Sequence, residues 1–175
     1  DNIIIIMLRA SRTLNLASAD AIANGAIAAV SDLAKFSPIT VTVLDTAGSI
    51  LVQKRMDGCP AGAYTQFSFA KARTCIHLQS SSRTFREKYT NAGEPAKFTQ
   101  AASMVSVLEG ELIPVAGGVL IRHSEDGSVV GSVGVSGAAA DEDEYIALQG
   151  VKTADLDSLL STEPPSHCCT TLKEP

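Results

Sequence analysis

The chain has 175 residues, of which 45% are hydrophobic and 19% are charged, and its formal net charge is −5. This length and this balance are typical of one folded domain and exclude a disordered chain. The basic residues are scattered without a run of Lys or Arg, so no nucleic-acid partner is predicted. No apolar stretch approaches the roughly 18 residues that a membrane span requires, so no span is predicted.

The two ends of the sequence lack the patterning of the middle. We expect an N-terminal extension at 1–13, a single domain at 14–150 and a C-terminal tail at 151–175. The apolar run at 3–8 is short and has no basic residue before it, which makes it a weak signal peptide at best. The alternative is that Met7 lies close to the natural start of the chain.

The cysteines give no sign of a disulfide scaffold. They form no C-x-x-C pair, and adjacent cysteines rarely bridge each other because disulfide geometry resists it. The four are Cys59, Cys75, Cys168 and Cys169. A reducing compartment is the usual setting of such a chain, so a cytoplasmic location is expected.

The first predicted elements are a helix and a hairpin. Apolar residues recur at spacings of three and four from Ser18 to about Lys35, and Ser18 is a favourable N-cap. Residues 39–44 alternate β-branched and small polar side chains, which indicates a half-buried strand. The turn formers at 45–48 predict a hairpin whose second strand is 49–54.

A loop and a second helix follow the hairpin. The cluster of Gly, Pro, Asp and Cys at 57–62 predicts the loop, and the helix is expected at 63–78. The polar stretch 79–100 is predicted to cross the surface, with a short helical turn at 83–88. Residues 101–115 are ambiguous between helix and strand.

A second hairpin and a last helix close the predicted domain. Strands are expected at 118–122 and 129–135 around a turn at 124–127. Acidic residues at 141–144 open a helix that runs to about Gly150, where their charge complements the helix dipole. Consecutive hairpins favour an antiparallel sheet with helices packed against it, so the predicted fold class is α+β.

Six segments, in this order, resemble the motifs of one protein family. They are VTVLDTAG at 41–48, KRMDGCP at 54–60, AKART at 70–74, PVAGGV at 114–119, VGSVGVSG at 130–137 and DEYIA at 143–147. Together they are similar to the GlcG/HbpS-like (haem-degrading) family, which is related to the C-terminal domain of some cobalamin adenosyltransferases. Two departures are Leu120, where the family usually has proline, and the divergent stretch 79–115.

The resemblance implies a profilin-like antiparallel sheet flanked by helices and a homo-oligomer, from dimer to octamer. It also implies a small-molecule ligand, haem or a related flat hydrophobic molecule, with turnover of that ligand as an extension. Two other functions stay open. One is an enzyme of the same scaffold that isomerises or cyclises a small metabolite by proton transfer. The other is an assembly module without ligand chemistry, because a fold does not fix a function.

Lys71 is the central candidate for catalysis. It lies on the otherwise apolar side of its helix, and a buried lysine is costly unless it is paired. Its partner could be Asp57, Glu94, Asp143 or a ligand propionate; otherwise its stem covers apolar surface while the ammonium reaches water. For the enzyme hypothesis, the catalytic set is Lys71, Tyr64, Glu94 and Asp143.

Haem iron needs an axial ligand, and three histidines are available. By helical spacing His77 shares a face with Arg73 and Thr74, so His77 and Thr74 are candidate ligand-binding residues. The alternative for His77 is a surface or capping role. His123 is expected at an exposed hairpin turn, and His167 lies in the predicted tail.

The remaining candidate ligand contacts are Arg55, Asp57, Gly117 and Gly118. Arg55 and Asp57 flank Met56 at the end of a strand, where the arginine could grip an anion or take part in a salt bridge that holds the following loop. The two glycines allow close approach of a ligand or chain, or a simple bulge. Consecutive carboxylates at 141–144 point in different directions on a helix, so no metal site is predicted.

Overall fold

The computed structural model of the protein describes residues 12–33, 36–60, 62–90, 94–154 and 160–162. The helices in these ranges are α1 (Leu16–Leu33), α2 (Ala63–Leu78), α3 (Ser82–Thr90), α4 (Pro95–Val107) and α5 (Ala140–Ala154). The strands are β1 (Thr40–Leu44), β2 (Ile50–Arg55), β3 (Gly118–His123), β4 (Val129–Ser136) and β5 (Leu160–Thr162). His167, Cys168 and Cys169 lie outside the described residues.

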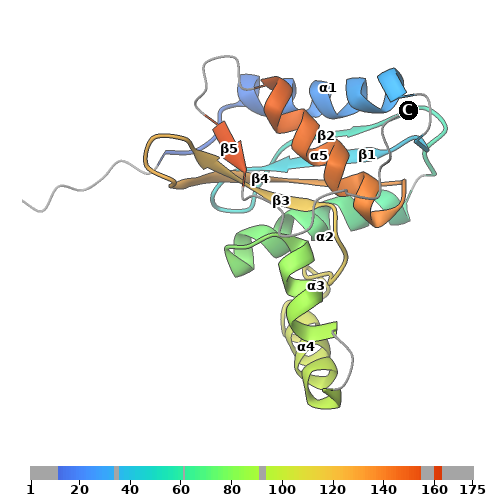
Figure 1. Cartoon of the computed structure of the whole chain (residues 1–175), viewed down its shortest axis with the longest axis vertical. Helices are drawn as coiled ribbons and strands as arrows, with labels where there is room; N and C mark the ends of the chain where they lie inside the picture. The colour runs from blue at the N-terminus through green and yellow to red at the C-terminus, as the bar shows by residue number, and fades with distance from the viewer. Residues whose placement is uncertain (1–11, 34–35, 61, 91–93, 155–159, 163–175) are drawn as a thin grey trace, which may run out of the picture.

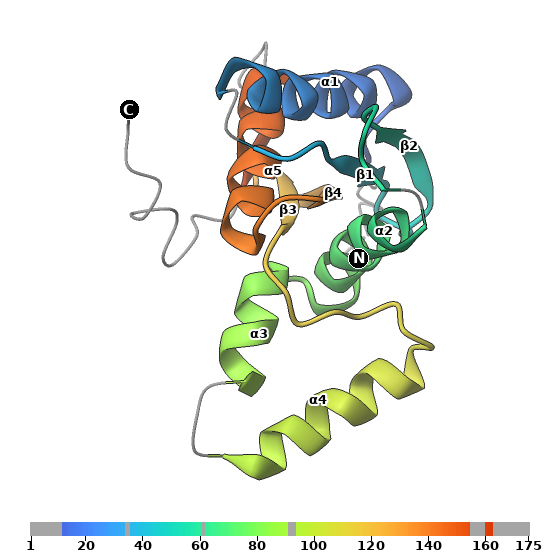
Figure 2. The ribbon, with the colours of Figure 1, turned by 90° about the vertical axis from the view of Figure 1, so that its right-hand side faces the viewer.

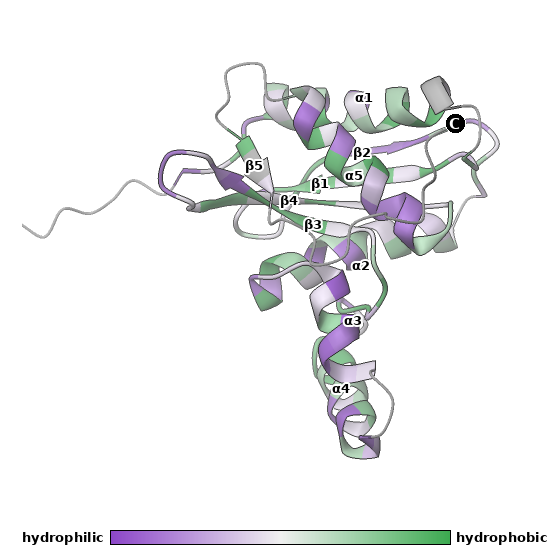
Figure 3. Ribbon diagram, viewed as in Figure 1, coloured by the Kyte–Doolittle hydropathy of each residue, from purple (hydrophilic) through white to green (hydrophobic). Residues whose placement is uncertain are grey.

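The five strands form one antiparallel sheet in the order β2-β1-β4-β3-β5. Helices α1 and α5 cover one face of the sheet, and α2 covers the other (Figure 1). Strands β1, β3 and β4 are predominantly hydrophobic, whereas the turn that joins β3 to β4 is hydrophilic (Figure 3). The predicted α+β domain, with an antiparallel sheet flanked by helices, is confirmed.

Four details differ from the sequence prediction. The first helix begins at Leu16, because the Asn15 Oδ1 accepts the backbone N–H of Ser18 at 2.8 Å and so caps the helix three residues earlier. The helical turn at 83–88 is a helix of nine residues, α3. The ambiguous stretch is helical only as far as the end of α4. Strand β5, which was not predicted, pairs with β3.

Helices α3 and α4 project from the sheet as an arm (Figures 1 and 2). The arm has its own small core, made by Phe85, Tyr89, Ala101 and Leu112. The main core lies between the sheet and the α1–α5 layer and is built from aliphatic residues such as Ile22, Val41 and Ile146. The polar stretch between α2 and β3 is therefore a folded extension of the domain.

Helix α2 lies unusually close to the sheet beneath it. A Cβ atom at Gly118 would be 2.2 Å from the Lys71 carbonyl oxygen, and one at Gly134 would be 2.1 Å from that of Ser68. Only glycine allows this separation between a helix backbone and a strand. The inward residues of α2, Ser68 and Ala72 among them, are correspondingly small. This contact fixes which face of α2 points outward.

Candidate functional site

A buried ion pair joins α2 to the start of α5. The Lys71 Nζ lies 2.7 Å from the Asp143 Oδ2, and it also donates to the Val135 carbonyl oxygen at 2.9 Å. The second carboxylate oxygen of Asp143 accepts the backbone N–H of Ala138 at 3.0 Å. Only 3% of the Lys71 side chain and 2% of the Asp143 side chain are exposed. Of the three acidic partners proposed for Lys71, the structure selects Asp143.

Burial has the largest effect on the pKa values of Lys71 and Asp143. It raises the pKa of Asp143 to about 6, against the opposing attraction of Lys71, and it lowers the pKa of Lys71. Gly117 closes over the pair with a φ of +123°, and a Cβ there would lie 2.8 Å from the Lys71 Nζ. The carboxylate and the ammonium are thus enclosed by this chain's own backbone.

A second ion-pair cluster joins the arm to α5. The Arg83 Nε donates to the Glu144 Oε2 at 2.8 Å, and a terminal guanidinium nitrogen contacts Asp141. Glu142 accepts the backbone N–H of Ala139 at 2.9 Å. The acidic run therefore lies at the helix N-terminus as predicted, but three of its members, Asp141, Asp143 and Glu144, also pair with buried cations on α2 and α3.

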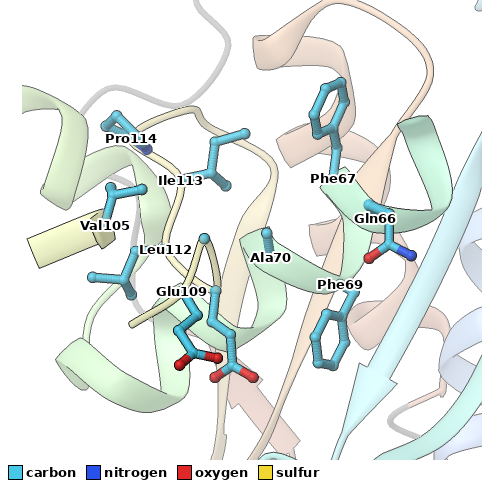
Figure 4. A pocket seen from close by; sticks show the side chains of 11 residues that line it. Gln66, Phe67, Phe69, Ala70, Val105, Glu109, Leu112, Ile113 and Pro114 are labelled. Carbon is cyan, nitrogen blue, oxygen red and sulfur yellow. The ribbon is translucent and has the colours of Figure 1, made fainter. Parts of the chain in front are cut away.

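A hollow of about 550 Å³ lies between α2 and the connection from α4 to β3 (Figure 4). Its walls are Gln66, Phe67, Phe69 and Ala70 of α2, together with Val105 and residues 109–114. Most of these side chains are apolar, and Phe67 is 43% exposed. The hollow has the size and the lining of a small-molecule site.

Three residues of α2 hold one wall of the hollow. The His77 Nε2 and the Arg73 Nε both lie 2.9 Å from the Glu111 Oε2, and the Thr74 Oγ1 accepts the backbone N–H of Ile113 at 2.9 Å. Hydrogen bonds from His77 and Arg73 hold the pKa of Glu111 below its usual value. The predicted grouping of His77 with Arg73 and Thr74 on one helix face is confirmed.

Of the other candidate residues, Tyr64 packs beside the hollow, and Glu94 and Asp57 lie apart from both places. Tyr64 contacts Phe67 edge to face at 6.2 Å between ring centroids, and Glu94 pairs with Lys97 at 2.8 Å on the arm. Exposed Asp57 lies in the loop after β2.

Arg55 holds its loop through a backbone contact instead of a salt bridge with Asp57. Its Nη1 donates to the Cys59 carbonyl oxygen at 2.5 Å. The structure thus brings together Lys71, Asp143 and Gly117. It leaves the other members of the predicted catalytic set, Tyr64 and Glu94, elsewhere, and their catalytic role stays a prediction.

Sequence reasoning missed the residues that line the hollow. Phe67 and Ala70 fell in the predicted helix at 63–78 without a functional role, and Glu109 and Glu111 fell in the ambiguous stretch 101–115. The available signal was the sequence Leu-Glu-Gly-Glu-Leu at 108–112, in which a glycine between two acids marks a helix end. It places two carboxylates beside apolar residues at a turn.

The family model for the haem degrading protein HbpS-like matches residues 14–152. The chain belongs to this family. Among solved structures, a double mutant of HbpS from Streptomyces reticuli is 25% identical to it, with a TM-score of 0.66. That likeness covers 83% of this chain and 89% of HbpS. The resemblance predicted from the six motifs is confirmed.

Two further structures resemble this HbpS-like chain. PduOC, solved as a haem complex, is 20% identical, with a TM-score of 0.68 over 81% of this chain and 94% of its own. Protein ORFY of Klebsiella pneumoniae is 19% identical, with a TM-score of 0.73 over 85% and 94%. At this identity the likeness shows a shared fold. No curated protein matches the chain, and none of the described helices is long and apolar enough to cross a membrane.

Breaking the buried pair should be costly because it leaves one unpaired charge in the interior. We expect Lys71→Met to lower the free energy of unfolding by about 3–5 kcal/mol, measured by urea titration. Lys71→Met combined with Asp143→Asn should recover most of this loss, because it removes both charges and keeps the acceptor for Ala138. The control is Lys54→Met, which removes an exposed pair with Asp20 and should cost about 1 kcal/mol or less. Equal losses for the two lysine variants would contradict this account.

The raised pKa of Asp143 gives stability a pH dependence of definite sign. Between about 4, its ordinary value, and about 6, its value in the fold, the folded protein keeps a proton that the unfolded chain releases. The contribution of Asp143 to stability should therefore fall as the pH rises through this window. The measurement is the difference in unfolding free energy between wild type and Asp143→Asn, from pH 3.5 to 7 in roughly half-unit steps. A difference that grows with pH would show the opposite shift.

Proposed function

We propose that this HbpS-like protein binds a small, flat, largely apolar ligand in the hollow, with haem or a related molecule as the candidate. The observation that carries the proposal is the hollow itself, a mostly apolar space of about 550 Å³ with an aromatic side chain left open to it. Sites for small ligands commonly combine such walls with a few polar groups. The haem-degrading family and the haem complex of PduOC support the choice of ligand.

The residues at the hollow suit a haem macrocycle. Phe67, Phe69 and Leu112 offer apolar surface for the ring. His77 contacts Glu111, which lines the hollow, and an imidazole whose second nitrogen binds a carboxylate is a common arrangement for metal ligation. His77, which contacts Glu111 but does not itself line the hollow, would hold the iron. Bound haem would supply an iron centre, and the chain would supply the apolar walls and an imidazole ligand.

The enzyme alternative has one observation in its favour. The pKa of Asp143 is raised and that of Lys71 is lowered, as in groups that transfer protons near neutral pH. A substrate would reach them only after the Gly117 segment moved, because both side chains are enclosed. Turnover is therefore the weaker proposal for this chain, and ligand binding is the stronger one.

We also propose that the protein assembles as a homo-oligomer in the cytoplasm. Phe98 on the arm is 51% exposed and Val107 is 79% exposed, and apolar side chains on a projecting element suit a protein partner. Cys59, which is buried, is a free thiol, as a reducing compartment favours.

Haemin titration tests the proposed function. The purified protein should show a saturable, stoichiometric change in the Soret band, and His77→Ala should weaken binding at least about tenfold, since it removes the axial ligand. The matched control is His123→Ala, which should bind as wild type does, because His123 ends β3 and does not line the hollow; it is also less exposed than the sequence predicted, with 13% of its side chain accessible. A linear response without saturation, or equal binding by both histidine variants, would contradict haem binding at this place.

A further inference from the structure

Two ionisable residues line the hollow, Glu109 and Glu111, and both are acids. Only one of the two carboxylates is paired with a basic side chain. Glu111 contacts Arg73 and His77, so its negative charge is offset. Glu109 is exposed at the edge of the hollow, and its side chain forms no hydrogen bond or ion pair with any part of the chain that the structure describes. The edge of the hollow therefore carries one uncompensated negative charge.

The backbone fixes the position of Glu109. Glu109 has a φ of +51°, directly after the C-cap of α4, and Gly110 follows with a φ of +83°. The Glu109 N–H donates to the Ser106 carbonyl oxygen at 3.1 Å, and the Gly110 N–H donates to that of Val105 at 2.9 Å. These two bonds form a Schellman motif, in which the residue at the position of Glu109 is usually glycine.

Glutamate at this position is unfavourable for the fold. A left-handed backbone brings its Cβ into conflict with the following carbonyl, and the carboxylate forms no contact within the described chain that would compensate. A glycine would suit the turn better. The side chain nevertheless borders the hollow together with Leu112 and Phe69 (Figure 4). A strained residue at the edge of a cavity is a candidate for a role in binding.

We propose that Glu109 makes the hollow selective for a flat apolar ligand that carries a positive charge, such as a protonated heteroaromatic amine. This inference rests on the proposed function and adds the charge of the ligand to it. The apolar walls bind the ring, and the exposed Glu109 carboxylate at the edge of the hollow attracts the cationic group. A ligand that places an ionised carboxylate beside Glu109 binds more weakly than an uncharged or cationic ligand of the same shape.

Two tricyclic dyes of similar shape and opposite charge test this selectivity. The full chain is titrated at low salt with 9-aminoacridine, a cation at pH 7, and with 9-anthracenecarboxylate, an anion, and binding is followed by dye fluorescence. The cation should bind about tenfold more tightly than the anion. Glu109→Gln should abolish most of this preference, and so should high salt. The control Glu125→Gln removes an exposed carboxylate from the β3–β4 turn and should leave the preference unchanged.

Two more variants separate ligand selection from a role in folding. Glu109→Gly should lose the preference while raising the urea midpoint of unfolding, because glycine suits the left-handed position. Phe67→Ala should weaken the binding of both dyes by a similar factor, and this result would place both dyes in the hollow.

The outcomes distinguish this inference from the proposed function. Equal binding of the two dyes by wild type, or an unchanged preference in Glu109→Gln, would overturn the role of Glu109 and leave the hollow as a binding site. Binding of haemin without either dye would also overturn it. If haemin and both dyes fail to bind, the proposed function itself fails, and the selectivity fails with it.

Discussion

The rest of the structure depends on the near contact between the backbone of α2 and strands β3 and β4. Gly118 and Gly134 make it possible, because a side chain at either position would overlap a carbonyl oxygen of the helix. Once α2 is held at this distance, the direction of each of its side chains is fixed. Lys71 points inward and must find a buried partner, whereas Phe67 and Ala70 point outward and form the floor of the hollow.

Charged side chains then connect the elements that hydrophobic packing alone would leave loosely joined. The Lys71–Asp143 pair ties α2 to α5, and Arg83 ties α3 to the same helix through Glu144. Arg73 brings the connection after α4 back onto α2 through Glu111. The hollow is the space that remains between α2 and the connection from α4 to β3 once these contacts are formed. Its shape is therefore a consequence of fixed contacts, as a preorganised ligand site requires.

Local patterns explain why so much of the fold could be predicted. Both hairpins and α2 follow from turn residues and short periodicities that need no knowledge of the rest of the chain. The cap of the first helix was placed three residues late, because Asn15 and Ser18 are both good caps and only the backbone geometry decides between them. Strand β5 was missed because three residues are too few to show alternation.

The candidate site was harder to predict because its parts come from distant segments. Lys71 was expected to be paired, but the choice among Asp57, Glu94 and Asp143 depends on how α5 packs against the sheet. Glu109 and Glu111 lay in a stretch whose secondary structure was ambiguous, so their position beside α2 could not be inferred. The helical face that carries His77 could be predicted because it needs only the spacing within one helix.

Hydrogen–deuterium exchange of the protein with and without haemin tests the central claim most directly, because it locates the ligand without any substitution. This account predicts slower exchange in peptides that cover 64–73 and 105–114, where the walls of the hollow lie. It predicts little change in β2 and the loop at 56–60. Protection confined to β2 and that loop, with none around 105–114, would show that the ligand binds elsewhere and would contradict the account.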